Sequence, residues 1–320
     1  MLLKKLVEIE SESGKEERLK GFVLSHLEEM GYEVVESEYY IATKCKSDLI
    51  VATHLDTVPI KRKFSTDGVY AYGTGVCDAK ASIAAMLEAA EEELPYTLAF
   101  FCDEEEGGKG SEEFASTWKW GRMAVVMEPT DMGIAATHYG SLDLLVEVFG
   151  RESHGSMPEM GVNAIEKAFE LIEKLKNLCN GECTVTPLKI EGGSDEYVIP
   201  SNCRIWFDIV LEPEMKVEDF LDRLDFLREY GNFRVESAYS GFKSGEVARI
   251  LEEAVRRAGL EVRYTEMKSW TDALNLAGRF DCTVWGPGEL HLCHTCEERV
   301  KIEDVYRARR VLVGLGEMLK

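Results

Sequence analysis

Short apolar runs alternate with helix-like stretches over the first 130 residues. Uninterrupted apolar runs end at Thr53, Phe101 and Met127, reading DLIVAT, YTLAFF and MAVVM. Residues 81–93 have helical apolar spacing between the first two runs, and a shorter stretch around 112–116 separates the last two. Strands buried on both faces lack in/out alternation, and the intervening helices provide the crossovers of parallel strands. We therefore predict an α/β fold with a mostly parallel sheet covered by helices.

The amino end has the pattern of two helices. Apolar residues recur at helical spacing over 2–9, and the segment SESGKEE follows. Ser13 and Glu16 have the spacing of a capping box, which predicts a second helix that ends at Gly31.

A second pattern begins near residue 134. SLDLLVEVFG alternates like a half-exposed strand, and helix-like and strand-like segments follow at 161–177, 202–211, 216–230 and 233–238. This order is typical of an antiparallel sheet with helices, an inserted α+β unit. The first pattern then resumes, with further elements expected at 247–258, 261–266, 282–285 and 302–319. We predict a discontinuous domain, 1–136 and 241–320, with a second domain, 137–240, inserted in it.

Composition and charge narrow the class of protein. The chain has 37 Lys+Arg against 59 Asp+Glu, a formal net charge of −22, which repels phosphate backbones and argues against a nucleic-acid partner. MLLKKL is too short for a signal peptide, and no apolar run approaches the roughly 18 residues of a membrane span. We expect a cytoplasmic protein without membrane contact.

The nine cysteines have no small-scaffold spacing, and their number is odd. In a chain without a signal peptide this favours reduced thiols. Cys179/Cys183 and Cys293/Cys296 could form a zinc knuckle only if the two pairs met, and they are 110 residues apart. We regard that knuckle as the less favoured interpretation.

Polar clusters stand directly after the three apolar runs. They read HLD at 54–56, DEEE at 103–106 and EPT at 128–130. Because ligands of open α/β sheets bind at the carboxyl ends of the strands, we expect these side chains to converge. A cation bound among them would lie beside the acidic block DEEE. A calcium EF-hand is excluded, because the twelfth position counted from Asp103 is Phe114, where such a loop needs a glutamate.

Each cluster offers chemistry suited to a hydrolytic metal site. His54 and Asp56 are two apart in extended chain, so Asp56 can orient the imidazole of His54 on a metal. Glu104 and Glu105 can supply one ligand and one group free to move protons. Pro129 holds the preceding Glu128 extended.

Two glycine-containing segments add candidates. GTGVCDAK lacks the third glycine of a dinucleotide loop, so we interpret it as a tight turn that presents Asp78 before a helix. GPGELHLCHTCEERV offers His291 and His294, either of which could complete the site.

The ordered set HLDTVP, GTGVCDAK, DEEEGGKG, MEPT, SHGSMPEMGVNAI and GPGELHLCHTCEERV resembles the co-catalytic di-zinc peptidase/deacetylase family, which contains acetylornithine deacetylase, succinyl-diaminopimelate desuccinylase and zinc carboxypeptidases. The resemblance covers nearly the whole chain. It implies a catalytic domain with an inserted lid and dimerisation domain, and two divalent metal ions, zinc or alternatively cobalt.

The resemblance also implies roles for individual residues. His54 and Glu128 would bind one metal, Glu105 and His294 the other, and Asp78 would bridge them. Glu104 would be the general base for the attacking water, with Asp56 orienting the site. Through the lid domain of a homodimer, His154 would reach the partner's site and polarise the scissile carbonyl.

Substrate recognition departs from the family pattern. Val210 stands where many relatives have an arginine that anchors a substrate carboxylate, and Arg204 is a possible substitute for that arginine. Tyr197 stands where many relatives have an asparagine. Lys61, Arg62 and Lys63 form a dense basic run beside the expected site. This run is either a solvated loop or a receiver for an acidic substrate or carrier protein.

The resemblance is nearest to hydrolases that release lysine or ornithine from an amino-group carrier protein, and to acetylornithine deacetylases. We therefore expect a deacetylase-type amide hydrolase of arginine or lysine biosynthesis. The alternatives are a zinc aminopeptidase or dipeptidase and, in a different class, a metal-binding scaffold without catalysis.

Overall fold

The computed structural model describes residues 1–320, which divide into two compact units. One unit comprises Met1–His138, Lys243–Met267 and Thr271–Lys320; the other comprises Tyr139–Phe242 and Lys268–Trp270. The sequence pattern predicted that the first segment ends at 136 and that the chain returns to this unit at 241; in the structure these boundaries lie two residues later, at His138 and Lys243.

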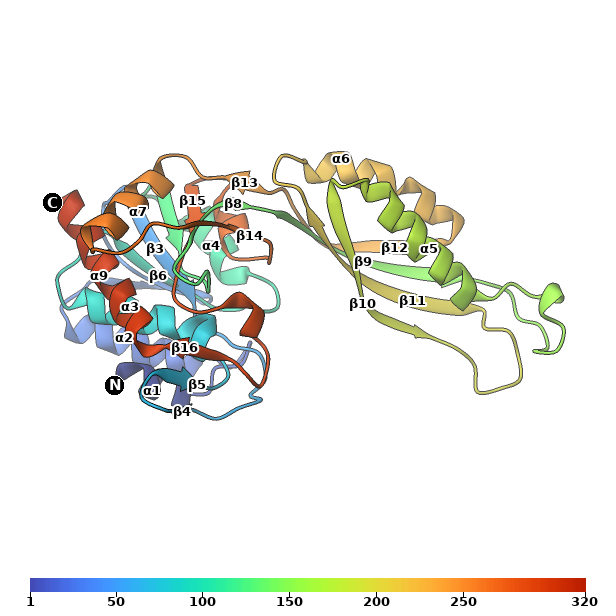
Figure 1. Ribbon diagram of the computed structural model, residues 1–320, viewed down its shortest axis with the longest axis horizontal. Coiled ribbons are helices and arrows are strands. Elements are labelled where there is room, and N and C mark those ends of the chain that lie inside the picture. The colour runs from blue at the N-terminus through green and yellow to red at the C-terminus, as the bar shows by residue number, and fades with distance from the viewer. The chain divides into compact units, whose positions relative to one another are not determined.

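The first unit is built on a mixed, mostly parallel sheet, which confirms the predicted fold class (Figure 1). At its centre β3 pairs in parallel with β6 and β7, and β7 pairs in parallel with β15. The strands in spatial order are β1 (Val34–Glu36), β2 (Tyr40–Thr43), β6 (Thr97–Phe101), β3 (Leu49–His54), β7 (Met123–Val126), β15 (Asp281–Val284), β8 (Ile134–His138) and β13 (Phe242–Lys243), with β14 (Tyr264–Met267) beside β8.

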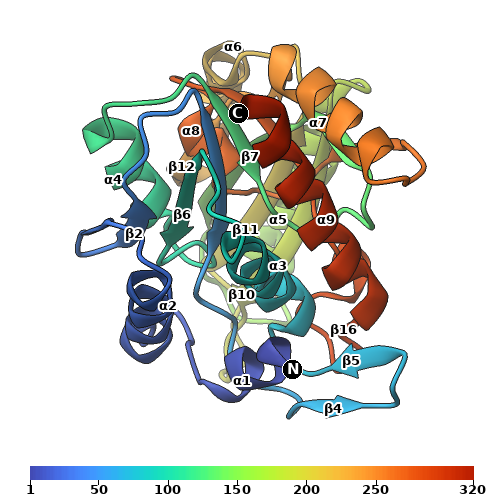
Figure 2. The same cartoon turned by 90° about the vertical axis from the view of Figure 1, so that its left-hand side faces the viewer.

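Helices cover both faces of this sheet, as the uninterrupted apolar runs predict. Leu98 and Phe100 of β6 face one apolar core, while the neighbouring Phe101 contacts Phe114 on the other side, with ring centroids 5.3 Å apart. Figure 2 shows the sheet between α4 on one side and α3 with α9 on the other. The helices of this unit are α1 (Leu2–Glu8), α2 (Glu17–Glu29), α3 (Ala81–Ala90), α4 (Lys109–Thr117), α7 (Glu246–Arg257), α8 (Ala273–Leu276) and α9 (Ile302–Leu319).

A small three-stranded sheet, which the sequence pattern did not reveal, joins distant parts of the chain. Its order is β16 (Arg299–Lys301), β5 (Tyr70–Tyr72) and β4 (Ser65–Thr66). Arg299 pairs with Tyr72 in the antiparallel register. The loop that follows β5 and the loop that precedes β16 are thereby held side by side.

The second unit is a four-stranded antiparallel sheet with helices on one face (Figure 1). Alternate residues of its strands, such as Leu144 and Ile205, are buried against α5, and the residues between them face away from that core. Its strands are β9 (Gly140–Phe149), β10 (Cys183–Gly192), β11 (Asn202–Leu211) and β12 (Gly231–Tyr239). Its helices are α5 (Ala164–Cys179) and α6 (Val217–Leu221), with two 3₁₀-helices, η2 (Pro158–Met160) and η3 (Asp222–Glu229). The edge strand β10 was missed because most of its residues are exposed.

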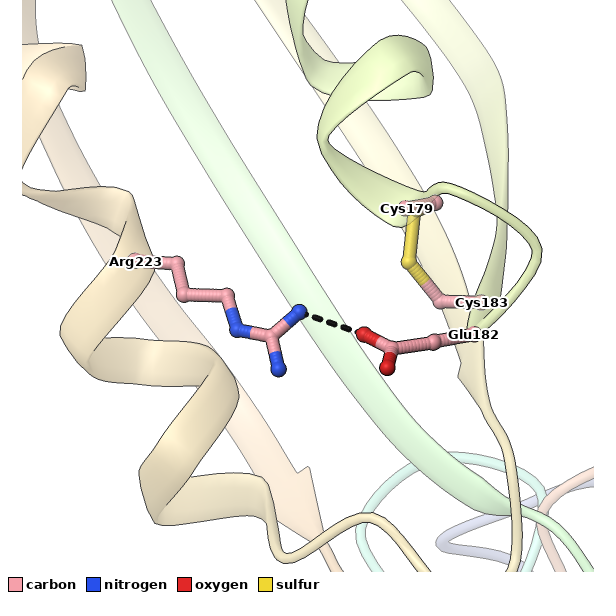
Figure 3. Close-up of a disulfide and its surroundings, with 4 residues drawn as sticks. All are labelled: Cys179, Glu182, Cys183 and Arg223. Atoms are coloured by element: carbon pink, nitrogen blue, oxygen red, sulfur yellow. Dashed lines mark hydrogen bonds and ion pairs between the residues drawn. A yellow bond between two sulfur atoms is a disulfide. The ribbon is translucent and has the colours of Figure 1, made fainter.

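The expectation of reduced thiols is wrong for one pair of cysteines. Cys179, at the end of α5, forms a disulfide with Cys183, at the start of β10 (Figure 3). Between them Glu182 pairs with Arg223 of η3 at 2.6 Å. A left-handed Asn180 and Gly181 turn the chain back after the helix, so the two sulfurs meet. This disulfide also excludes Cys179 and Cys183 as zinc-knuckle ligands.

The predicted capping box at the amino end is also wrong. Helix α2 begins at Glu17, and its N-cap residue is Glu16, whose side chain makes no capping hydrogen bond. Ser13 is not at the helix end, and its hydroxyl donates instead to the carboxylate of Asp56 at 2.8 Å. No helix in the chain combines the length and apolar character needed to cross a membrane.

Candidate metal centre

Four neighbouring strands deliver polar residues to one edge of the large sheet. Because β6, β3, β7 and β15 run in parallel, the residues after them emerge on the same side. Glu104 and Glu105 follow β6, His54 ends β3, and Glu128 follows β7. The loop that carries His294 follows β15 by way of the short turn η4 (Leu290–Leu292).

The first cluster consists of His54, Asp78 and Glu128. The Nε2 atom of His54 lies 3.0 Å from Asp78 Oδ1 and 3.7 Å from Glu128 Oε2. All three residues are buried. Burial disfavours a charge on His54, but the surrounding carboxylates raise its pKa well above the ordinary value.

The second cluster shares Asp78 with the first. His294 Nε2 lies 3.2 Å from Asp78 Oδ2 and 3.0 Å from Glu105 Oε2. These contacts raise the pKa of His294 to about 10. Asp78 belongs to the turn η1 (Val76–Lys80), and although its burial opposes ionisation, His294 and His54 hold its pKa below the ordinary value.

Asp56 holds the acidic residues Glu104 and Glu105 in place beside His54. Its Oδ1 accepts a hydrogen bond from the backbone N–H of Glu104, and its Oδ2 accepts one from the backbone N–H of Glu105, each at 3.0 Å. The same carboxylate lies 3.5 Å from Nδ1 of His54 and is fully buried. Asp56 therefore connects the strand end of His54 with the loop of Glu104 and Glu105.

Glu104 lies beside both clusters without belonging to either. Burial raises its pKa well above the ordinary value, and the charges of Glu128, Asp272 and Glu105 add to this effect. A carboxyl group with a raised pKa is suited to accept and return protons near neutral pH. Asp103 and Glu106 stand apart: Asp103 pairs with Lys109 at 3.2 Å, and Glu106 is exposed.

The donor set fits two divalent cations. Each cluster offers one imidazole nitrogen and two carboxylates with ligand atoms within 4.8 Å of one another, and Asp78 supplies one oxygen to each. Nitrogen and carboxylate oxygen are ligands that zinc accepts. Buried Glu128 Oε1 has no hydrogen-bond partner, and burial raises the pKa of Glu128 well above normal. A cation between these groups would compensate the converging negative charge.

Comparison with known families settles the class of protein. The model of peptidase family M20/M25/M40 matches residues 50–317. The chain belongs to this family. Its resemblance to the co-catalytic peptidase/deacetylase group is thereby confirmed, and the chain is a metallohydrolase of the M20 type.

Several curated relatives align over most of the chain. An uncharacterized metallohydrolase of Methanocaldococcus jannaschii is 28% identical over 300 residues, covering 88% of this chain and 86% of the relative. Acetylornithine deacetylase of Myxococcus xanthus is 29% identical over 305 residues, covering 83% and 79%. The [LysW]-lysine/[LysW]-ornithine hydrolase of Sulfurisphaera tokodaii is 24% identical over 332 residues, covering 99% and 94%.

Solved structures share the fold. A tripeptidase of Staphylococcus aureus superposes with a TM-score of 0.85 at 22% identity and covers 99% of this chain and 96% of its own. A dinuclear metal-binding M20 peptidase of Bacillus subtilis gives a TM-score of 0.74 at 16% identity, covering 99% and 96%.

The basic run contacts the backbone of the His294 loop. Lys61 Nζ donates to the carbonyl oxygen of His294 at 2.6 Å, and Arg62 donates to that of Cys296 at 3.1 Å. The Arg62 guanidinium also lies over the ring of Tyr72. Lys63 is exposed. Two of the three cations therefore have a structural partner beside the candidate site.

The remaining predicted residues lie elsewhere. Exposed His291 is 3.9 Å from Glu289 and belongs to neither cluster, which distinguishes it from His294. In the second unit, Arg204 pairs with Glu147 across the sheet at 2.9 Å, and exposed His154 contacts the hydroxyl of Ser156 at 2.8 Å. The roles predicted for Arg204 and His154 remain predictions.

Two buried carboxylates near the site were missed as functional candidates. Glu298 accepts hydrogen bonds from the backbone N–H groups of Cys77 and Asp78, at 3.0 and 3.3 Å. Asp272 is fully buried with both oxygens unpartnered, and burial raises its pKa to about 7. Asp272 stands in the segment SWTDALNL, residues 269–276, where an isolated acidic residue gives no signal of burial.

Proposed function

We propose that this M20 protein hydrolyses the amide bond of an N-acylated amino acid or of a carrier-protein-linked precursor, releasing ornithine or lysine in arginine or lysine biosynthesis. The observation that carries the hydrolytic part is the pair of three-ligand clusters that share Asp78, with Glu104 beside them. The names of two relatives, acetylornithine deacetylase and [LysW]-lysine/[LysW]-ornithine hydrolase, support the substrate class.

The proposed reaction assigns separate tasks to the residues of the site. His54 and Glu128 would hold one cation, Glu105 and His294 would hold the other, and Asp78 belongs to both ligand sets. The cations, zinc or cobalt, would supply Lewis acidity toward the attacking water and the carbonyl oxygen. Glu104 takes the proton of the water and returns it to the leaving amine. Asp56 keeps Glu104 at a fixed place through its backbone N–H, so the base needs little reorganisation.

The proposal includes a second copy of the chain. In it, the second unit mediates a homodimer, and His154 of one protomer polarises the scissile carbonyl in the site of the other. Exposure of the His154 side chain in the single chain is consistent with this role. Because Val210 replaces the expected arginine, Arg204 and the basic run Lys61–Lys63 remain the proposed contacts for an acidic substrate or carrier.

The test is amine release from Nα-acetyl-L-ornithine and Nα-acetyl-L-lysine by chelated protein and by the same protein reloaded with zinc or cobalt. Release that requires the metal supports the deacetylase-type function. Hydrolysis of unmodified dipeptides or tripeptides alone, at the same metal content, would instead identify an aminopeptidase or dipeptidase. No hydrolysis of either class by protein that holds two metals would contradict the small-substrate form and direct the search to a carrier-linked amide.

A further inference from the structure

Two thiols lie against each other immediately beside two candidate ligands. The Sγ atoms of Cys77 and Cys293 are 3.5 Å apart, although 216 residues separate them in sequence. Cys77 precedes Asp78, and Cys293 precedes His294. Cys77 is fully buried, and Cys293 is 9% exposed. Neither sulfur has a task in the proposed hydrolysis.

Cys77 has little freedom to move. Its backbone N–H donates to the buried carboxylate of Glu298 at 3.0 Å. Its sulfur packs directly on the backbone of Gly288, where an added Cβ would lie only 2.1 Å from that sulfur. Gly288 adopts a left-handed conformation, with φ of 106°, which favours glycine at this contact.

Cys293 lies at the end of η4, in the loop that carries His294. Its sulfur has Cys77 as one neighbour and the carbonyl oxygen of Glu289, at 3.6 Å, as the other. His294 follows with a left-handed φ of 62° and a half-exposed side chain. Movement of Cys293 toward Cys77 would therefore be transmitted directly to His294.

We propose that Cys77 and Cys293 form a reversible disulfide, and that this bond displaces His294 from its contact with Asp78 and Glu105. A disulfide requires its sulfurs at about 2.05 Å, so the present separation must close by about 1.5 Å. Because Gly288 and Glu298 hold Cys77, the loop of Cys293 makes most of this movement.

The oxidant of the proposed step is a peroxide. The more accessible Cys293 sulfur attacks one peroxide oxygen, the O–O bond breaks, and a sulfenic acid and water result when the released oxygen takes up the thiol proton. The Cys77 sulfur then attacks the Cys293 sulfur, the S–O bond breaks, and a second water leaves with the Cys77 proton. Two thiols and one hydrogen peroxide thus give one disulfide and two waters.

The consequence concerns the cation held by Glu105 and His294. Loss of one ligand from a three-residue set weakens metal binding, so the oxidised protein retains the cation at His54 and Glu128 better than the other. The effect on metal content depends only on the candidate ligands. The effect on turnover rests on the proposed hydrolytic function.

Zinc-loaded protein is treated with hydrogen peroxide, desalted and divided between two measurements. Peptide mapping after alkylation detects a cross-link between the peptides of Cys77 and Cys293, and elemental analysis gives the metal content. We expect the cross-link, a fall from two zinc ions per chain toward one, and restoration of two after dithiothreitol and zinc. Amide hydrolysis, where present, should fall at least about 10-fold and recover in parallel.

Variants separate this pair from other thiols. Cys293→Ala cannot form the bond and should keep both zinc ions after peroxide treatment. If this variant folds poorly, Cys77→Ala serves in its place, with the same expected result. Cys282→Ala removes a buried free thiol elsewhere and should respond like the unmodified chain. Cys296→Ala should also respond normally, whereas loss of its response would assign the bond to Cys293 and exposed Cys296 and overturn the proposal.

Further results are decisive. Separately alkylated Cys77 and Cys293 after complete peroxide treatment contradict the disulfide, and a cross-link without zinc loss contradicts the displacement of His294. A cross-link with reversible zinc loss in a protein that hydrolyses no tested amide upholds the inference and contradicts only the proposed function.

Discussion

The Oδ1 atom of Asp56 accepts a hydrogen bond of 3.0 Å from the backbone N–H of Glu104. The spacing HLD predicts that Asp56 serves His54, and the structure places its carboxylate 3.5 Å from that imidazole. The additional bond to Glu104, and the matching bond from Glu105, give Asp56 a second task. One buried carboxylate thus fixes the relative positions of a candidate ligand and the candidate base.

Replacement of Asp56 should therefore damage the site through geometry. We expect Asp56→Asn to lower kcat by about 10–100-fold and to weaken the metal bound by Glu105, because an amide cannot accept both backbone hydrogen bonds and serve His54. Ser13→Ala removes only the 2.8 Å hydroxyl contact to the same carboxylate and should have a smaller effect. Parallel kinetics and metal titrations compare the two; equal effects would contradict the backbone role.

Glu104→Gln tests the base. The amide keeps the size of the side chain but cannot accept the proton, so kcat should fall by at least about 100-fold while both metals remain bound. Glu106→Gln makes the same change at an exposed neighbour and should leave kcat within about 2-fold. Full activity of Glu104→Gln would assign the base elsewhere, and a metal-loaded parent chain that hydrolyses neither small amides nor a carrier-linked amide would support the scaffold alternative.

The two histidines of the GPG loop should behave differently. His294 contacts Asp78 and Glu105, whereas His291 is 73% exposed. We expect His294→Ala to bind about one zinc ion where the parent binds two, and His291→Ala to bind both. Elemental analysis after dialysis against micromolar zinc measures this, and reduced stoichiometry in His291→Ala would overturn the assignment.

The basic run divides into anchoring and free cations. Lys61 bonds to the carbonyl of His294, so Lys61→Ala should lower kcat and zinc affinity by loosening that loop. Lys63 is exposed, so Lys63→Ala should raise KM for an acidic substrate and flatten its salt dependence at unchanged kcat. Initial rates at several salt concentrations distinguish them. Unchanged KM in Lys63→Ala would indicate a solvated loop.

Asp272 gives a pH-dependent prediction for stability. Its folded pKa of about 7 exceeds the unfolded value of about 3.9, so the folded state binds an extra proton between these values. The cost of burying the charged carboxylate is absent below about pH 4 and complete above about pH 7. In metal-free protein, Asp272→Asn should raise Tm at pH 8 by on the order of 5 °C, with the gain vanishing toward pH 4. A lower Tm at pH 8 would show that the charge is needed.

Several strands were predictable because the apolar pattern of their sequence matches the positions that are buried in the structure. The strand at 202–211 has the same bounds in the structure, and β3, β6 and β7 match their apolar runs within two residues. Edge and short strands such as β5 and β10 were missed because few of their side chains are buried. Ser13 was misassigned because a hydroxyl that fits a helix cap also fits the tertiary acceptor Asp56.

The sequence by itself determined the fold class, the order of the polar clusters and the chemical types of their residues. Parallel strands must present their carboxyl ends together, so His54, Glu105 and Glu128 were expected at one edge. Only the tertiary structure decided how Asp78 and His294 reach them, since this depends on the pairing of β5 with β16. The contact of Cys77 with Cys293 has the same origin: local propensities carry no information on which distant loops a pairing of two short strands brings together.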